Sequence, residues 1–181
     1  MDFTTGTFEI GGIDINPNTK VTTLKENPNF QVIKDDYPYS TISVAEKTGL
    51  GISVSAETRL GEHDFKVDIY CVYNQIARII LTPILSEELA DIDTVPQELK
   101  DILYQELRRR VCDAFLLHNL GFNLNIEPSK VTQCGLFYEF SWGAITRWIF
   151  LDGYPGPNKG GYIEIIYPDD WREWILSEFG K

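Results

Sequence analysis

The two histidines are the first side chains to consider for chemistry, because imidazole titrates near neutral pH and also ligates metals. His63 lies in Gly61-Glu62-His63-Asp64, which predicts a hairpin turn. His118 lies near the end of a predicted long helix, where an imidazole can interact with the last carbonyls. Neither has the context of a Ser-His or Cys-His nucleophile, and the chain has no Gly-x-Ser-x-Gly motif. We expect a solvated turn residue and a structural helix residue.

Paired carboxylates are the other candidate catalytic groups, since acid–base chemistry needs only two that the fold brings together. The chain has 27 acidic residues, too many for the sequence to select a pair. Glu139 and Glu164 lie on predicted strands among aromatic residues and are the two that we single out. We expect both to point outward from a half-exposed sheet, and a carboxylate-based hydrolase remains an alternative function.

Metal and cofactor motifs are incomplete. Asp14-x-Asn16-x-Asn18 matches the first three ligands of an EF-hand loop, but Thr19 and Lys25 stand where that loop needs glycine and glutamate. No complete phosphate-binding loop or dinucleotide fingerprint is present. We therefore expect a polar turn at 14–19, no metal site and no cofactor.

The three cysteines are an odd number with wide spacing. Cys71, Cys112 and Cys134 form no Cys-x-x-Cys pair, which excludes a zinc ribbon and a thioredoxin-type site. We expect small buried hydrophobic residues in a reducing compartment.

The strands that would position these groups are indicated by turns and by alternation. A Gly-Gly pair between apolar residues predicts a hairpin over 7–15, followed by a short helix over 19–26. Apolar residues alternate with polar ones over 52–57 and 65–73, and another strand follows over 76–82. These segments predict an antiparallel meander.

One long helix is predicted after residue 94. Thr94-x-x-Gln97 is a capping-box pattern, Pro96 fits a first turn, and Gly121 is a typical C-terminal stop. Six apolar residues fall within one broad face, as in an amphipathic helix that packs on a core. They are Leu99, Leu103, Leu107, Val111, Ala114 and Leu117.

The last third returns to strands over 135–141, 144–152 and 161–167, and a short helix follows with Asp169 or Asp170 as its N-cap. The predicted fold class is therefore α+β: a mainly antiparallel sheet of hairpins and a meander, one long central helix, and short helices near both ends. A chain of 181 residues fits a single domain, 1–181.

The net charge of the chain limits the classes of partner that it can bind. The chain has 16 basic and 27 acidic residues, a net charge of −11, which disfavours a phosphate backbone or an anionic membrane as a partner. No apolar run is long enough for a transmembrane helix, and the first residues do not resemble a signal peptide. We expect a cytoplasmic protein, and an acidic surface either suits a basic protein partner or simply keeps the domain soluble.

Two segments carry a resemblance to a known group. The first is Phe8–Thr19, and the second comprises Phe140–Ile145, Asp152, Gly160-Gly161 and Ile163–Tyr167, about a third of the chain in all. They resemble the opening and closing strands of acidic immunity proteins of bacterial toxin systems, or of uncharacterised proteins encoded near them. The resemblance implies a non-catalytic protein that neutralises a toxin by stoichiometric binding, with no cofactor and no transferable active-site residue.

The candidate partner-binding surface is the loop between the last two strands together with acidic residues that follow. A carboxylate surface with aromatic anchors can occupy a basic cleft. A structural or adaptor homo-oligomer is the main alternative, and the sequence leaves the oligomeric state open. The candidate residues are Tyr154, Asn158, Lys159, Asp169, Asp170 and Glu173.

Overall fold

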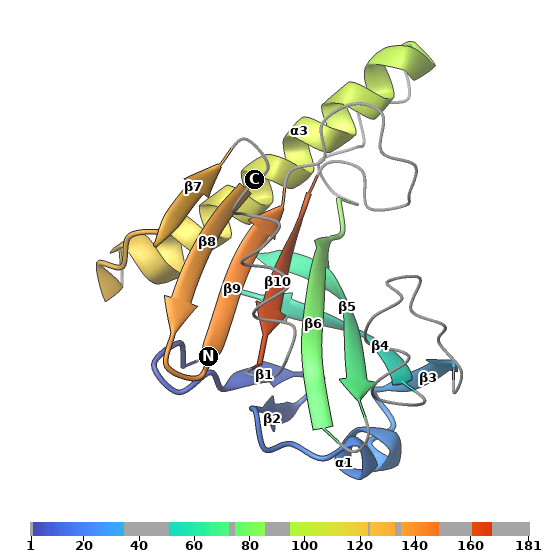
Figure 1. Cartoon of the computed structure of the whole chain (residues 1–181). Helices are drawn as coiled ribbons and strands as arrows, with labels where there is room; N and C mark the ends of the chain where they lie inside the picture. The colour runs from blue at the N-terminus through green and yellow to red at the C-terminus, as the bar shows by residue number, and fades with distance from the viewer. Residues whose placement is uncertain are drawn as a thin grey trace.

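A computed structural model of the chain describes residues 2–34, 51–72, 75–85, 95–122, 124–132, 135–148 and 161–167. These residues form an eight-stranded antiparallel sheet, a two-stranded hairpin and a long helix, which confirms the α+β class (Figure 1). None of the helices within these ranges is long and apolar enough to cross a membrane. The strands of the large sheet are β3 (Gln31–Lys34), β4 (Gly51–Leu60), β5 (His63–Val72), β6 (Gln75–Pro83), β7 (Lys130–Thr132), β8 (Gly135–Phe140), β9 (Gly143–Trp148) and β10 (Tyr162–Ile166).

The N-terminal segment forms the hairpin that its Gly-Gly pair predicts. Strands β1 (Phe8–Ile10) and β2 (Ile13–Ile15) pair antiparallel. Gly11 and Gly12 join them with φ of 60° and 81°, a left-handed pair that glycine adopts without strain. The short helix α1 (Val21–Glu26) follows within the segment 19–26. The predicted C-terminal helix lies outside the described residues.

The middle of the sheet contains the predicted meander, β4–β5–β6, with each strand antiparallel to the next. The sheet order is β3-β4-β5-β6-β10-β9-β8-β7, so the last strand in sequence lies between β6 and β9. Both faces of β10 are covered, since its five residues are all buried. Gly143 begins β9 beside it, where a Cβ would collide with the carbonyl oxygen of Ile166.

The long helix α3 (Gln97–Leu116) continues into a π-helix, η2 (Leu117–Phe122). Pro96 is the N-cap residue and makes no side-chain cap, so the expectation of Pro96 inside the first turn is wrong. The helix ends at Phe122, one residue after the predicted stop at Gly121. The chain leaves the helix at Asn125, which has a φ of 53° and donates its N–H to the carbonyl oxygen of Gly121.

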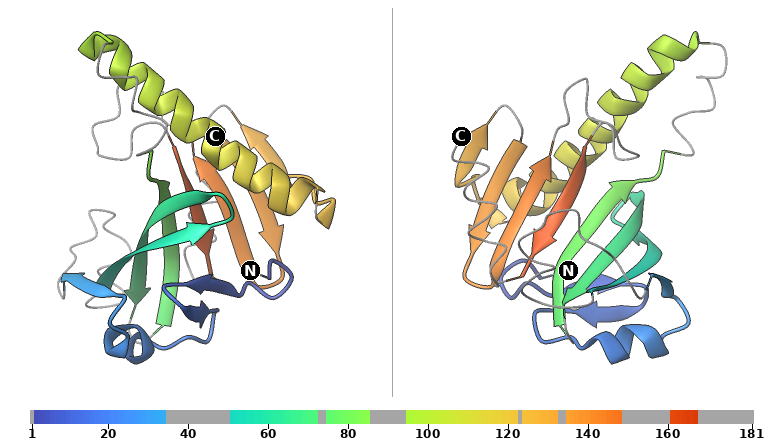
Figure 2. Two further views of the ribbon diagram at one scale, coloured as in Figure 1. Left: turned by 180° about the vertical axis from the view of Figure 1, so that it is seen from behind. Right: turned by 45° about the vertical axis from the view of Figure 1, so that its right-hand side comes forward.

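Helix α3 turns a different side to the sheet from the one that its apolar spacing predicts. Of the predicted face, Val111 is buried, but Leu99, Leu103 and Leu117 are exposed. Figure 2 shows that α3 crosses the sheet diagonally and that its N-terminal half projects beyond the strands. Leu117 lies at the other end of α3 and is exposed because the buried residues there lie on a neighbouring face of the helix. A prediction from periodicity alone cannot include where the sheet ends. The buried side chains of α3 are Val111, Cys112, Phe115 and Leu116.

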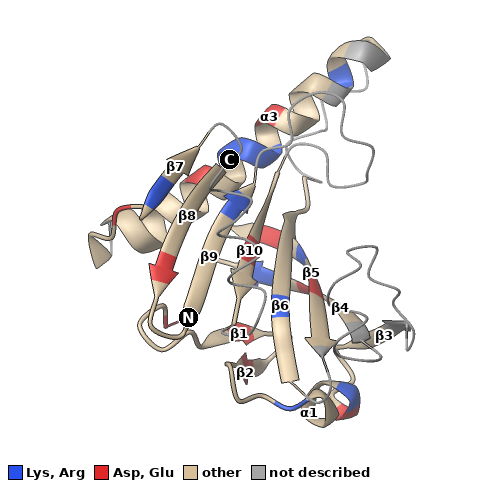
Figure 3. Cartoon of the chain, in the orientation of Figure 1, with Lys and Arg blue, Asp and Glu red and all other residues tan. Residues whose placement is uncertain are grey.

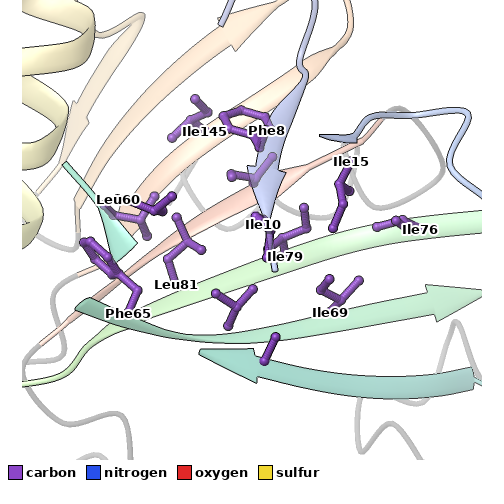
Figure 4. Packing of buried hydrophobic residues seen from close by; sticks show 14 of the residues in the cluster. Phe8, Ile10, Ile15, Leu60, Phe65, Ile69, Ile76, Ile79, Leu81 and Ile145 are labelled. Atoms are coloured by element: carbon purple, nitrogen blue, oxygen red, sulfur yellow. The ribbon is translucent and has the colours of Figure 1, made fainter. Parts of the chain in front are cut away.

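The hydrophobic core lies between one face of the sheet, α3 and the N-terminal hairpin. Figure 4 shows side chains from β1 and β2 meeting side chains from the meander and β9. Aromatic residues lie where the N-terminal hairpin meets the sheet. Trp142 donates its indole N–H to the carbonyl oxygen of Phe3 at 2.7 Å. Tyr167 likewise donates its hydroxyl to the carbonyl oxygen of Gly6 at 3.0 Å. These bonds fix the start of the chain to its closing strands.

Candidate functional site

A pocket of about 290 Å³ lies between the β4–β5 turn and the C-terminal end of α3, and both histidines line it. No sequence pattern associates the two histidines, because each lies in a separate element. The fold brings them to one cavity. Its walls include Leu60, Glu62, His63, Phe115, His118 and Asn119.

Two local features place these residues. Leu60 pairs with His63 across the hairpin, so Gly61 and Glu62 form the exposed tip of the turn. On the opposite wall, His118 lies on the π-helix η2, a conformation that is rare and often found at functional sites. Asn119 is fixed there because its side-chain amide donates to the carbonyl oxygen of Phe115 at 2.7 Å.

The pocket contains acid–base groups without a nucleophile beside them. Its described lining has no Ser, Thr or Cys. Across the described part of the chain, no group of three or more His, Cys, Asp or Glu is arranged to hold a metal ion. Of the polar turn predicted at 14–19, the part from Asn16 onward is confirmed, since the backbone N–H of Asn18 donates to the side chain of Asn16 at 2.8 Å, whereas Asp14 lies in β2. The His63–His118 pocket can therefore receive a polar group of a ligand or partner, but it does not assemble a catalytic set.

Glu164 occupies a second polar cluster, inside the sheet. It is only 2% exposed, so the expectation of an outward-facing position is wrong. One carboxylate oxygen lies 2.6 Å from Nε of Arg78. The other accepts a hydrogen bond from the indole N–H of Trp148 at 2.6 Å and one from the hydroxyl of Thr146 at 3.3 Å. Arg78 also lies over the ring of Tyr70, 4.9 Å from its centroid.

This cluster is typical of a structural ion pair rather than of an active site. Both oxygens of Glu164 have partners from neighbouring strands. Glu139 is exposed, as expected, on β8. It pairs with Ala144, whereas Glu164 pairs with Thr146, so their Cα atoms lie two strands and two residues apart, on the order of 10 Å. The register does not place the two residues side by side.

A second set of charges connects α3 with the sheet. Arg147 on β9 is 7% exposed, and its Nε lies 2.8 Å from a carboxylate oxygen of Asp113. Asp113 also pairs with Arg109 at 2.9 Å, and Arg109 pairs with Glu106 at 2.7 Å. The sequence pattern did not reveal this network, because Arg147 and Asp113 belong to elements with no fixed spacing between them.

The described cysteines are buried free thiols. Cys71 is 1% exposed on β5, and Cys112 is fully buried in α3, which confirms the expected burial of both. Burial raises the pKa of each thiol to about 12, because the thiolate would lose its hydration. Neither is therefore a reactive nucleophile at neutral pH. Cys134 lies outside the described residues.

The predicted partner-binding surface also lies outside the described residues: none of Tyr154, Asn158, Lys159, Asp169, Asp170 and Glu173 is among them. Those positions stay predictions.

Comparison with protein-family models, with curated proteins and with solved structures gives no match for this chain. The fold therefore defines the class only as an α+β protein with an eight-stranded antiparallel sheet and one long helix packed on it.

Proposed function

We propose that this chain is a non-catalytic binding protein: an immunity protein that neutralises a basic bacterial toxin by stoichiometric binding in the cytoplasm. The observation that carries the proposal is the unpaired negative charge on its surface. Figure 3 shows the acidic residues of the described chain in red. Among the described residues, seven exposed carboxylates make neither an ion pair nor a side-chain hydrogen bond. They are Glu9, Asp14, Glu26, Glu57, Glu62, Asp64 and Glu127.

Unpaired carboxylates favour binding of a basic partner in two ways. They attract it over a distance, which raises the association rate, and they form pairs with its Lys and Arg side chains on contact. A carboxylate already paired within the chain would contribute less. The expected complex should form quickly and weaken as salt screens the charges.

The site geometry supports binding over hydrolysis. The carboxylate of Glu164 already contacts Arg78 and Trp148, and Glu139 lies on a strand that is not adjacent to β10. The two histidines share a pocket with no neighbouring nucleophile among its described walls. Glu62 at the rim of that pocket is one of the unpaired carboxylates, so a basic side chain of a partner fits there.

The test is capture of a partner from the source cells by tagged protein, with elution by stepwise salt and mass spectrometry. One stoichiometric basic protein, released at high salt, is the expected result. That protein must stop growth when expressed alone, and co-expression of this chain must restore growth. A captured protein without toxicity, or toxicity that this chain does not relieve, contradicts the proposal.

Two charge-reversal variants test which surface of the chain binds the partner. The first reverses Asp169, Asp170 and Glu173 to Lys, and the second reverses Glu62 and Asp64 on the described turn. Loss of binding in the first alone supports the predicted loop surface. Loss in the second alone places the partner at the His63–His118 pocket and overturns the predicted surface. A control reverses Glu9 and Asp14 on the N-terminal hairpin, which is distant in sequence from both.

A further inference from the structure

The His63–His118 pocket combines apolar walls with a few polar side chains. Leu60 and Phe115 on its walls are buried, and Ala114 adds a methyl group from α3. Its volume of about 290 Å³ lies just below the roughly 300–1,000 Å³ of typical small-molecule sites. The pocket is therefore large enough for one long side chain and small for a nucleotide.

Three polar groups of the pocket can accept hydrogen bonds and have no partner for that role within the described part of the chain. The amide nitrogen of Asn119 is already used by the carbonyl oxygen of Phe115, which leaves Oδ1 of Asn119 to accept. The carboxylate of Glu62 and the imidazole of His118 make no hydrogen bond, and a neutral imidazole has one acceptor nitrogen. A ligand that satisfies these groups must donate at several positions.

The charges around the pocket favour a cation. When the histidines are neutral, Glu62 is the one charged side chain among the described lining residues. The C-terminal end of the long helix adds partial negative charge, and no basic residue in its last turn offsets it. Arg59 pairs with Asp64 on the opposite face of the hairpin from the Leu60–His63 pair. Its guanidinium donates to the backbone carbonyl oxygen of Glu62 at 3.3 Å and forms no ion pair with the Glu62 carboxylate.

We propose that the His63–His118 pocket receives one arginine side chain of the protein partner. A guanidinium is planar, has five N–H donors and binds a carboxylate through two parallel hydrogen bonds, so it can contact Glu62 and still donate to Asn119. Its aliphatic stem lies against the apolar walls. A lysine ammonium is a compact, strongly hydrated charge and matches this set of acceptors less well. The inference deepens the proposed function and rests on it for the partner that supplies the arginine.

The test uses the full chain and a capped arginine, so it does not depend on the partner. N-acetyl-L-arginine N-methylamide is added to ¹⁵N-labelled protein, and the chemical shifts of amides and imidazoles give a dissociation constant. Signals of His63, His118 and Asn119 should move together and saturate. Capped citrulline has nearly the same shape without the charge, and it should bind about tenfold more weakly than capped arginine. Capped lysine should bind about threefold more weakly.

Matched variants connect binding to the pocket. Glu62→Gln removes the charge of the pocket and should raise the dissociation constant of capped arginine about tenfold. Asp64→Asn removes the same charge from the opposite face of the same hairpin and should change that constant by less than about twofold. Ala114→Leu fills the apolar part and preserves helix propensity, so it should weaken binding as much as Glu62→Gln does. All three positions are exposed, and circular dichroism should show that each variant folds.

Several results overturn the proposal. Capped arginine can give no saturable shifts, or capped citrulline can bind equally well. Asp64→Asn can weaken binding as much as Glu62→Gln does. A capped glutamate that binds more tightly than capped arginine would assign the histidines to an anion. Free L-arginine that binds more tightly than the capped form would assign the pocket to a small molecule instead of a residue of a partner.

The arginine site and the immunity function fail separately. A captured toxin should bind the Glu62→Gln variant about tenfold more weakly than the wild-type chain. If it binds both equally, the arginine site is overturned and the immunity function stands. If capped arginine binds with the expected specificity but the captured partner is not toxic, the arginine site stands and the immunity function is contradicted.

Discussion

The centre of the sheet and the outer face of α3 reverse the usual relation between residue type and burial. Glu164, a carboxylate, is 2% exposed on β10, whereas Ile102, an aliphatic residue, is 57% exposed on α3. Neighbours cause the difference. Glu164 lies on β10 between β6 and β9, whose Arg78 and Trp148 contact its carboxylate, while the N-terminal end of α3 extends beyond the strands (Figure 2). Position in the fold, rather than side-chain hydrophobicity, decides which residues meet water here.

The buried carboxylate is tolerated because its neighbours replace the water that it loses. Removing a charge from water costs several kcal/mol, and only close partners offset that loss. Arg78 and Trp148 each approach Glu164 to 2.6 Å. On α3, Glu106 makes comparable contacts with Arg109 but remains largely hydrated, so its ion pairs contribute little. A carboxylate–arginine ion pair therefore contributes far more to stability inside the sheet than on the surface of α3.

The largest expected effect comes from breaking the buried pair. Glu164→Ala leaves Arg78 without its carboxylate and should lower the free energy of unfolding by about 3–5 kcal/mol. The matched change on α3, Glu106→Ala, should lower it by less than about 1 kcal/mol. Urea denaturation followed by circular dichroism measures both. Equal losses would show that the two regions do not differ. The double variant Arg78→Met/Glu164→Leu should recover most of the stability.

A smaller loss of stability is expected to distinguish the buried face of α3 from its exposed face. Phe115 is 6% exposed and packs edge-on against Phe65, with ring centroids 5.4 Å apart. Phe115→Ala should therefore lower the free energy of unfolding by about 3 kcal/mol through lost burial and a cavity. Ile102→Ala should change it by about 0.5 kcal/mol or less. Thermal unfolding of dilute samples tests both, and a large loss at Ile102 would mean that its side is packed.

The smallest expected effect concerns the buried thiols. Cys71 and Cys112 have a folded pKa of about 12 against an ordinary value of 9.0, so the fold favours the neutral thiol. The stabilisation that the two neutral thiols contribute to the fold is fully present below pH 9 and is lost as pH rises towards 12. At pH 10 each thiol should lower the free energy of unfolding by about 1.4 kcal/mol relative to pH 8. Denaturation at both pH values measures this.

A Cys134→Ser background restricts the thiol experiment to the two described cysteines. In that background Cys112→Ala should remove about half of the cysteine contribution to the pH dependence. Maleimide should label the folded protein slowly and the urea-unfolded protein rapidly. Fast labelling of the folded form would mean that these thiols meet water.

Much of the local structure was predictable from the sequence. The Gly11-Gly12 pair determined the first hairpin, because a two-residue turn with positive φ selects glycine. Alternation of apolar and polar residues determined the meander, since side chains of a strand point to opposite faces. Helical spacing predicted α3, although its bounds and its buried face were wrong in detail.

The candidate sites were not predictable in the same way. His63 and His118 line one pocket because the β4–β5 turn meets the end of α3, and no local pattern contains that contact. Glu164 looked like an outward-facing residue, since the sequence does not say that β10 lies between two earlier strands. Leu99 and Leu103 looked like core residues, since the spacing does not say where the sheet stops.

The sequence by itself determined the charge, the turns and the period of each element, because these depend on residues a few positions apart. Only the tertiary structure decided which face of each element is buried. That outcome depends on strand order and on how far α3 overlaps the sheet. Both are set by contacts between residues far apart in the chain, where water is excluded or admitted by the assembled fold rather than by any one segment.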